Sequence, residues 1–276
     1  MYLRSAVLAF VLALAPSVVA AEAPQSSPIV IGQSWKLASR TLSATRTINV
    51  WTPPSYAKGD RRYPVVYLID GGLSQDFEHI TGLAQLGALS WEWRDVIVVG
   101  IETVDRRHEL AFPVERDETL KRDYPTAGAS DAFRRYVIDE VKPFVERQYR
   151  TSGENALMGE SLAGLFIVET LLKQPAAFDT YIAIDPSLWW DKGRLAEAAS
   201  GLLAQNRPVK KRIWLSIGRE TSEQPVNAQR FVAAIKALPA GAVELHDEPR
   251  PALTHATIYH PTALEAFRTL YPRPAQ

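Results

Sequence analysis

Near its middle the chain reads Ala156-Leu157-Met158-Gly159-Glu160-Ser161-Leu162-Ala163-Gly164, and apolar residues continue from Leu165 to Leu172. The first run is typical of a strand and the last of an amphipathic helix. Small residues flank Ser161, as a tight strand-to-helix turn requires, because a bulky side chain there would collide with the neighbouring backbone. The sequence therefore predicts a strand, a sharp turn and a helix, with the Ser161 hydroxyl at the apex, close to the N–H groups of the helix N-terminus.

A serine in this position is typical of the nucleophile elbow, G-x-S-x-[G/A], of the α/β-hydrolase fold. The five-residue pattern occurs by chance in many chains, so the strand before it and the helix after it give it its weight. The alternative is a Gly/Ser turn without chemistry. Along the rest of the chain, buried apolar runs alternate with helical patterns, which predicts a mostly parallel, doubly wound sheet with helices on both faces.

The apolar patterns predict eight strands, of which the first two are antiparallel. The strand segments are 29–39, 45–51, 63–70, 96–101, 156–158, 181–184, 212–218 and 242–246. Helices are expected over 80–89, 130–145, 165–172, 195–205, 227–238 and 261–270. Pro143 should kink or shorten the helix that begins at Ser130, because proline lacks the N–H that a helix interior needs.

The N-terminus resembles a secretory signal peptide rather than a membrane anchor. A basic residue precedes a short apolar run and small residues follow, so cleavage is expected after Ala20, Ala21 or Ala23. The apolar run is too short to span a bilayer. We therefore expect a signal peptide over 1–23 and an α/β-hydrolase catalytic domain over 24–276. The mature protein should be periplasmic or secreted, without stable membrane insertion.

Composition excludes several classes of partner. Lys+Arg and Asp+Glu both number 31, so no net field attracts nucleic acid or an acidic membrane. The chain has no cysteine, so neither a disulfide nor a lipid-modified cysteine can form. It shows no metal-ligand cluster, phosphate-binding loop or nucleotide fingerprint, and no cofactor is expected. The expected partner is a small-molecule ester substrate.

A serine hydroxyl is a poor nucleophile unless a histidine takes its proton and a carboxylate orients that histidine. In this fold the chain order is serine, acid, histidine, and catalytic groups lie beyond the carboxyl ends of the strands. His255 follows the last predicted strand, in the loop 251–257, which is the position expected for the base. The other histidines are expected to be structural or surface residues: His79, His108, His246 and His260.

The carboxylate that orients His255 is expected in the loop after the seventh predicted strand. Glu220 lies two residues past the glycine of that strand and is preferred on loop position alone. Glu223 in the same loop and Asp185 at the end of the preceding strand are the alternatives. Any of the three is otherwise a solvated loop carboxylate.

Ester cleavage also needs N–H donors for the oxyanion. The N–H of Leu162 is one candidate, and the loop after the strand 63–70 supplies the other. There Gly71-Gly72 lets a substrate carbonyl approach the backbone, and we choose Gly72 as the donor. The alternative is that the two glycines only make a tight turn.

Two tryptophans and an arginine are candidates for substrate contact. Trp189 and Trp190 follow a strand and form either a flat aromatic wall, suited to an aryl or bulky acyl group, or part of the core. Arg106, with Arg107 beside it, lies in a loop that can meet an anionic substrate. Paired arginines at a surface are, however, usually solvated or salt-bridged.

With these residues assembled, the chain resembles the esterase D family of α/β hydrolases, and within it the branch of enterobactin-type ferric-siderophore esterases. The matching stretches run from Ser34 to Tyr271 and include 65–71, 98–101, 105–106, 159–166, the Pro-Ser-Leu-Trp-Trp run at 186–190 and the late His255. The Pro-Ser-Leu-Trp-Trp run is the most specific to the branch, whereas the elbow is generic. The resemblance implies Ser161 as nucleophile, His255 as base and the loop of Glu220 as the place of the acid.

Two positions depart from the family pattern. Glu160 stands where His, Phe or Tyr is usual, and Asp185 stands where a serine is common before the Pro-Ser-Leu-Trp-Trp run. Both add negative charge near the site and bring an anionic ferric-catecholate substrate into question. Some members of the branch rely on a Ser–His pair with a weak or absent acid.

These observations predict an exported serine esterase. Ser161 attacks the ester, Gly72 and Leu162 hold the oxyanion, and water releases the acyl group through His255. The expected substrate is a siderophore-type or aryl ester. Two alternatives share the fold: an acyltransferase that passes the acyl group to a sugar, and a catalytically silent binding protein. A binding protein has no need of serine, histidine and acid together, which disfavours the last.

Overall fold

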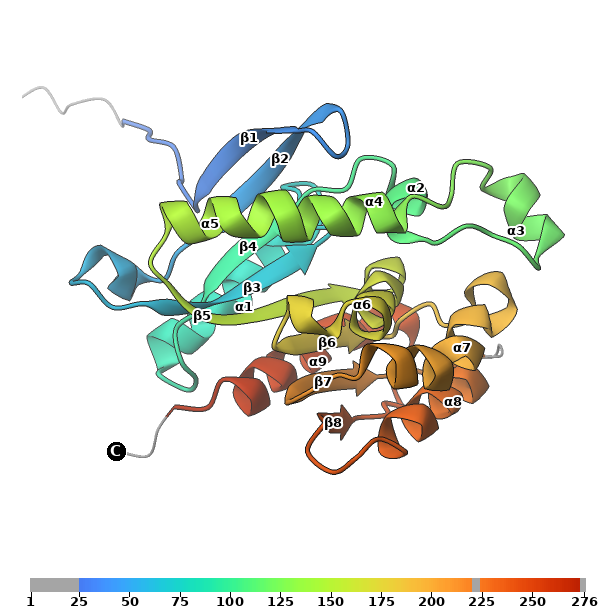
Figure 1. Cartoon of the computed structure of the whole chain (residues 1–276). Helices are drawn as coiled ribbons and strands as arrows, with labels where there is room; N and C mark the ends of the chain where they lie inside the picture. The colour runs from blue at the N-terminus through green and yellow to red at the C-terminus, as the bar shows by residue number, and fades with distance from the viewer. Residues whose placement is uncertain (1–24, 220–223, 274–276) are drawn as a thin grey trace, which may run out of the picture. The chain divides into compact units, whose positions relative to one another are not determined.

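In the described part of the chain, eight strands form one sheet in the order β1-β2-β4-β3-β5-β6-β7-β8 (Figure 1). The structure is a computed structural model that describes residues 25–219 and 224–273, so the predicted signal peptide, residues 1–23, lies outside it. β2 is antiparallel to both of its neighbours, and all other pairs are parallel. The strands are β1 Gln33–Ser39, β2 Ala44–Trp51, β3 Tyr63–Ile69, β4 Ile97–Ile101, β5 Thr151–Glu160, β6 Thr180–Ile184, β7 Lys211–Ser216 and β8 Val243–Asp247. The predicted α/β-hydrolase fold is confirmed.

Strand β3 shows why both faces of the sheet are covered. All of its residues are buried, and successive side chains alternate between two hydrophobic clusters. Val65, Tyr67 and Ile69 belong to one cluster, whereas Val66 and Leu68 belong to the other. This is the two-residue period of strand side chains. A continuous apolar run therefore needs a helical layer on each face.

The helices form these two layers (Figure 1). α1 and α9 pack on the face of Val66 and Leu68, and α4 to α8 pack on the opposite face. The helices are α1 Phe77–Ser90, α2 Arg106–Leu110, α3 Glu118–Asp123, α4 Ser130–Arg135, α5 Lys142–Gln148, α6 Leu162–Lys173, α7 Trp190–Asn206, α8 Gln224–Lys236 and α9 His255–Leu270. None of the helices within the described residues is long and apolar enough to cross a membrane.

The helix around Pro143 continues past the proline. α4 runs into a π-helical turn, Tyr136–Val141, and then into α5, which has Pro143 in its first turn. A π-helical turn shifts the hydrogen-bond pattern by one residue, so the missing N–H of the proline falls where the pattern is already interrupted. The expected kink or shortening is replaced by a local widening of the helix.

Several boundaries differ from the predicted ones, and two of these differences have a clear local cause or consequence. β1 begins at Gln33, so residues 29–32 are not part of the first strand. The last helix begins at His255 rather than at Pro261, which lies inside it. Thr254 and Thr257 form a capping box that satisfies N–H groups of the first turn. This cap starts α9 earlier than the proline suggests.

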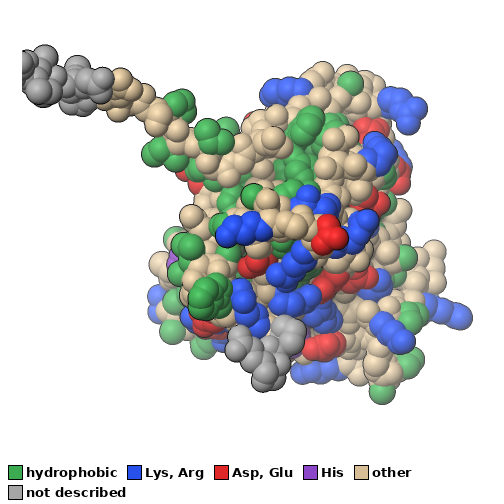
Figure 2. Space-filling model, turned by 90° about the vertical axis from the view of Figure 1, so that its left-hand side faces the viewer, with side chains coloured by type: hydrophobic (Ala, Val, Ile, Leu, Met, Phe, Trp, Pro, Cys, Tyr) green, Lys and Arg blue, Asp and Glu red, His purple; other side chains and the backbone are tan. Residues whose placement is uncertain are grey.

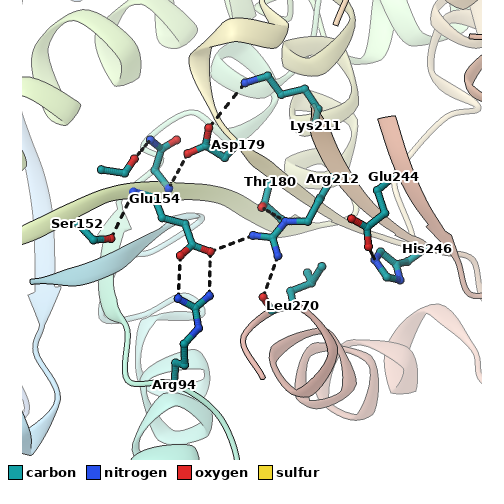
Figure 3. Close-up of polar contacts among 12 residues, drawn as sticks. Arg94, Ser152, Glu154, Asp179, Thr180, Lys211, Arg212, Glu244, His246 and Leu270 are labelled. Carbon is teal, nitrogen blue, oxygen red and sulfur yellow. Dashed lines mark hydrogen bonds and ion pairs between the residues drawn. The ribbon is translucent and has the colours of Figure 1, made fainter. Parts of the chain in front are cut away.

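Ion pairs close the end of the sheet at which the parallel strands begin. Lys and Arg side chains gather on this side of the molecule (Figure 2). The Glu154 carboxylate accepts hydrogen bonds from Arg94 at 2.9 and 3.0 Å and from Arg212 at 3.0 Å (Figure 3). Arg212 also donates to Thr180 Oγ1 and to the backbone oxygen of Leu270. The network joins β5, β6, β7 and the end of α9, and the opposite end of the sheet carries the candidate site.

Candidate active site

The turn at Ser161 has the strained geometry expected of a nucleophile elbow. β5 ends one residue before it and α6 begins one residue after it. Ser161 has φ 62° and ψ −120°, a conformation that residues other than glycine rarely adopt. Backbone hydrogen bonds hold it: the Ser161 N–H donates to Ile184 O at 3.0 Å, and the Ser187 N–H donates to Ser161 O at 3.0 Å. The apex is therefore tied to β6 and to the loop after β6.

Two glycines of the elbow are required by close contacts. A Cβ atom at Gly159 would lie 2.6 Å from the Cβ of Ala163, and one at Gly164 would lie 2.9 Å from the Cα of Pro186. Both distances are far below van der Waals contact, so a larger residue has no room. The expected strand, turn and helix are all present, and their tightness has a direct steric cause.

A buried carboxylate contacts His255. The Nδ1 atom of His255 lies 2.6 Å from an oxygen of Asp185, whose residue is 1% exposed. The other oxygen of Asp185 accepts the Gly218 N–H at 3.0 Å, and the Asp185 N–H donates to Ser216 O at 2.7 Å. The end of β6, the end of β7 and the start of α9 therefore meet at this carboxylate. Such a contact orients an imidazole and sets which ring nitrogen carries the proton.

Of the three carboxylates predicted as possible partners of His255, the described structure includes one. Asp185, which the sequence ranked behind Glu220 and Glu223, is the one seen in contact with His255. Glu220 and Glu223 lie outside the described residues, so their placement is not part of the structure. Asp185 directly follows β6, and β6 is the hydrogen-bonded neighbour of β5. A carboxylate at the end of β6 is therefore held next to the elbow at the end of β5.

His255 lies in a different element from the one predicted. It is the first residue of α9 rather than part of a loop, and Thr254 caps the helix in front of it. The other histidines make contacts of their own. His79 contacts His260 at 2.9 Å, His246 contacts Glu244 and stacks on Trp214, and His108 contacts the backbone oxygen of Thr126.

The two predicted oxyanion donors differ in what they contact. Leu162 is the first residue of α6, so its N–H has no acceptor within the helix. The Gly72 N–H donates to Oε1 of Gln75 at 2.9 Å. Gln75 is itself held by Thr103, whose backbone and hydroxyl oxygens accept from its Nε2 at 3.0 and 2.9 Å. The Gly72 donor is thus occupied by a side chain that the sequence analysis did not single out.

Arg106 forms an ion pair at the edge of the site. Its Nε donates to Asp70 at 2.6 Å, and its Nη2 reaches the backbone oxygen of Glu160 at 3.4 Å. The side chain is 39% exposed. Its charge is therefore largely balanced by Asp70. Arg107 stacks on the ring of Tyr124, with its guanidinium carbon 4.4 Å from the ring centre.

The two tryptophans have separate roles. Trp190 is buried, and its ring N–H donates to the backbone oxygen of Phe112 at 3.2 Å. The Trp190 ring is thus part of the core, the alternative that the sequence analysis left open beside the aromatic wall. Trp189 is 38% exposed, and its ring centre lies 5.9 Å from that of Trp190. Of the proposed aromatic wall, only Trp189 reaches the surface.

Two carboxyl groups beside the elbow hold protons more tightly than usual. Burial raises the pKa of Glu160 to about 7; the charges of Asp76 and Asp185 add to this, and those of His255 and Arg106 oppose it. Burial and the charge of Asp70 raise the pKa of Asp76 to about 6, against the effect of Arg106. The sequence singled out Glu160 as a departure from its family, but nothing in the local pattern pointed to Asp76.

No group of three or more His, Cys, Asp or Glu within the described residues is arranged to hold a metal ion.

Comparison with known proteins finds esterases among the similar sequences and structures. Among curated proteins, "Ferri-bacillibactin esterase BesA" of Bacillus subtilis is 31% identical over 171 residues. The alignment covers 56% of this chain and 58% of BesA, which is less than two thirds of that relative. A solved "IroE-like serine hydrolase" from Shewanella oneidensis superposes with a TM-score of 0.77 at 26% identity, over 87% of this chain and 80% of that one.

A second solved structure, "Siderophore hydrolase EstB" from Aspergillus nidulans, has a TM-score of 0.74 at 19% identity. It covers 91% of this chain and 98% of its own, and at this identity it shows a likeness of fold alone. The family model described as "Putative esterase" matches residues 39–263, which is most of the chain. The protein therefore belongs to this esterase family.

Proposed function

We propose that this protein is a serine esterase that cleaves carboxylic esters through an acyl-enzyme on Ser161. The observation that carries the proposal is the 2.6 Å contact between Asp185 and Nδ1 of His255, beside the strained turn of Ser161. In this arrangement His255 takes the hydroxyl proton through its other ring nitrogen, and Asp185 stabilises the imidazolium that forms. Membership of the esterase family supports the same reaction.

The reaction has two halves. Ser161 Oγ attacks the carbonyl carbon while its proton passes to His255. The protonated His255 then gives this proton to the leaving alcohol, and the acyl group stays on Ser161. Water attacks the acyl-enzyme with His255 as base, which releases the acid and restores the serine.

The oxyanion of each half is held by the N–H groups of Leu162 and Gly72. The Leu162 N–H lies at the positive end of the dipole of α6. The Gly72 N–H is bound to the amide oxygen of Gln75, so the substrate oxygen has to share or displace that acceptor. An anionic oxygen is a stronger acceptor than a neutral amide or ester oxygen. The exchange therefore favours the transition state over the bound ester.

A siderophore-type or aryl ester is the proposed substrate class. BesA is named a ferri-bacillibactin esterase and EstB a siderophore hydrolase. The partly exposed ring of Trp189 offers a surface on which an aryl group can stack. The measurement is turnover on a panel that contains alkyl esters, aryl esters and a siderophore trilactone, with free acid as the product that distinguishes hydrolysis from acyl transfer.

Export completes the proposal, on the basis of the signal peptide over 1–23. The mature chain should begin between Ala21 and Pro24. Intact-mass analysis of the exported protein checks this, and a mass that includes Met1 would contradict it.

The nucleophile is tested by Ser161→Ala. Turnover should fall by on the order of 10⁶, because the members of such a triad act as a unit. The protein should stay folded, since one hydroxyl at a turn apex fills no core space. An organophosphonate, which traps activated serines, should label Ser161 in the wild type.

Ser187→Ala is the matched control, because the Ser187 hydroxyl lies 3.5 Å from that of Ser161. The label should stay on Ser161 in this variant. Labelling at another serine, or unchanged hydrolysis by Ser161→Ala, would falsify the assignment of the nucleophile.

A further inference from the structure

Glu160 places a carboxylate directly beside the nucleophile. It is the last residue of β5, pairs with Ile184 in β6 and precedes Ser161. Its side chain is only partly exposed, and within the described residues its carboxylate has no hydrogen bond or ion pair. A partly buried carboxylate without such partners is costly, and a positive charge brought near it is stabilised.

A second carboxylate and a buried hydroxyl lie on the same side of the site. Asp76 precedes α1, and its side chain does not cap that helix. Tyr259, one turn after His255 on α9, is 8% exposed, and its hydroxyl has no hydrogen-bond partner in the described structure. The ring of Tyr259 packs edge-on against that of His79 in the first turn of α1, with the ring centres 5.0 Å apart. Burial raises the pKa of Tyr259, and the charges of Asp76, Glu160 and Asp70 add to this effect. The Asp76 N–H donates to Asp70 O at 2.9 Å, and Arg106 joins Asp70 to the backbone oxygen of Glu160. Among the described residues, the side chains of Glu160, Asp76 and Tyr259 make no hydrogen bond to one another.

The basic side chains around this cluster are already engaged. His255, whose charge lowers the pKa of Glu160, contacts Asp185 at 2.6 Å. Arg106 donates to Asp70 at 2.6 Å, and it reaches only the backbone oxygen of Glu160. His79 shares a hydrogen bond with His260 at 2.9 Å, and burial together with the charge of His260 lowers the pKa of His79. The charge of Arg106 lowers the pKa of both carboxyls, but burial outweighs it in each case. The chain as a whole has no net charge, so the negative field at these carboxylates is local and is not part of a negative charge of the whole protein.

We propose that Glu160 and Asp76 make the site selective for esters with a positive charge near the scissile bond, over matched esters with a negative charge there. The proposal rests on the esterase function proposed above and names the charge class of its substrate. An ammonium group within a few ångströms of either carboxylate is attracted, whereas a carboxylate or other anion is repelled. Desolvation of the site by a bound ester strengthens both effects.

The selectivity should depend on pH with a defined sign. Below about pH 6 both carboxyls carry protons for most of the time and the field is weak, whereas above about pH 7 both are ionised and the field is strong. The groups that face this pair are His255 and Tyr259 on α9, Asp185 after β6, Asp70 after β3 and Arg106 on α2. Protonation of His255 slows the cleavage of all esters alike, so it cancels in the ratio of kcat/KM for two esters measured at the same pH.

The experiment uses three esters of one alcohol whose acyl chains end in a methyl, a trimethylammonium or a carboxylate group. The readout is the ratio of kcat/KM for the cationic ester to that for the anionic ester. In the wild type this ratio should be at least about tenfold at high pH and should fall toward one near pH 5.5. Glu160→Gln and Asp76→Asn should each lower the ratio at high pH.

Glu244→Gln is the matched control, since Glu244 is an exposed carboxylate that, among the residues the structure describes, contacts His246 alone. Its ratio should equal that of the wild type. A wild-type ratio near or below one at high pH, or a ratio that neither Glu160→Gln nor Asp76→Asn changes, overturns the proposal. Hydrolysis of the neutral ester separates the two levels: if none of the three esters is cleaved, the esterase function fails and the charge selectivity fails with it.

Discussion

At the scale of single residues, the backbone of Asp185 and the contacts of its two oxygens hold its carboxylate in one orientation. Its backbone has φ 43°, a left-handed conformation that is unfavourable for an aspartate but that directs the side chain toward α9. One oxygen is committed to the Gly218 N–H and the other to His255. The carboxylate therefore has one orientation, and so does the imidazole that it contacts.

Asp185→Asn should lower turnover by up to ~10⁴ without unfolding the protein. The Gly218 N–H needs an acceptor, so the oxygen of the new asparagine should face Gly218 and its NH₂ group should face Nδ1 of His255. The imidazole then carries its proton on Nε2 and cannot accept the proton of Ser161. Steady-state kinetics on a neutral ester, with a thermal unfolding curve, measure this effect.

Glu220→Gln and Glu223→Gln are the comparison variants, and both should have mild effects. A large loss in Glu220→Gln with near-normal turnover in Asp185→Asn would assign the acid to the loop after β7. If all three variants are mild, the protein works with a Ser–His pair.

At the scale of elements, the turn at Ser161 is tight because β5 and α6 approach each other so closely that only a glycine fits at position 159. Gly159 faces Ala163 in the first turn of α6, and Gly164 faces Pro186 in the loop after β6. The same approach places the N–H of Leu162 at the apex. α9 contributes from the other layer, because its capped N-terminus carries His255 and its next turn carries Tyr259.

Gly159→Ala should destabilise the protein by roughly 1–3 kcal/mol and reduce turnover, because the added methyl overlaps the Cβ of Ala163 and displaces the elbow. Gly201→Ala in α7 is the matched control, since its added methyl meets no atom within 4 Å. That variant should be more stable by roughly 0.5–1 kcal/mol, from helix propensity alone. Urea unfolding of the two variants gives the comparison, and equal stabilities would show that the elbow is not sterically tight.

At the scale of the whole molecule, the two ends of the sheet treat charge in opposite ways. At the end where the parallel strands begin, Glu154 is paired with Arg94 and Arg212. Burial alone would raise the pKa of Glu154, but the hydrogen bonds and charges of the two arginines hold it below its usual range. At the opposite end, Glu160 has no such partner in the described part of the chain, and its pKa is raised. The described structure thus pairs the carboxylate at one end with two arginines and leaves the one at the other end without an ion pair.

Glu154→Gln should lower the free energy of unfolding at neutral pH by roughly 1–3 kcal/mol, because two arginines lose their charged partner. A depressed native pKa contributes stability above the usual glutamate range, and that stability is lost as the pH falls through the native value. The difference between variant and wild type should therefore shrink below about pH 4. Urea unfolding at neutral and acid pH measures it, and a difference that grows toward low pH would contradict the ion-pair account.

The sequence alone was enough to predict the sheet, the turn at Ser161 and the place of His255 in the chain, because these depend on residues close together in sequence or on chain order. The apolar runs predicted the sheet because strand side chains alternate over two residues and cover both faces. The small residues around Ser161 predicted the turn, because its steric limits act within a few positions of the chain. Chain order placed His255 after the last strand, which the structure shows, although its place at the start of α9 depends on a cap that the proline obscured.

Contacts between distant segments were decided by the tertiary structure. Asp185 meets His255 across 70 positions of sequence because β6 lies beside β5 and α9 returns to the same end of the sheet. Trp190 is in the core and Trp189 at the surface, although the two are adjacent in sequence. The convergence of Asp76 with Glu160 arises in the same way. Charge and burial act through space, so the order of strands and the packing of helices, rather than any local pattern, determine which groups share one environment.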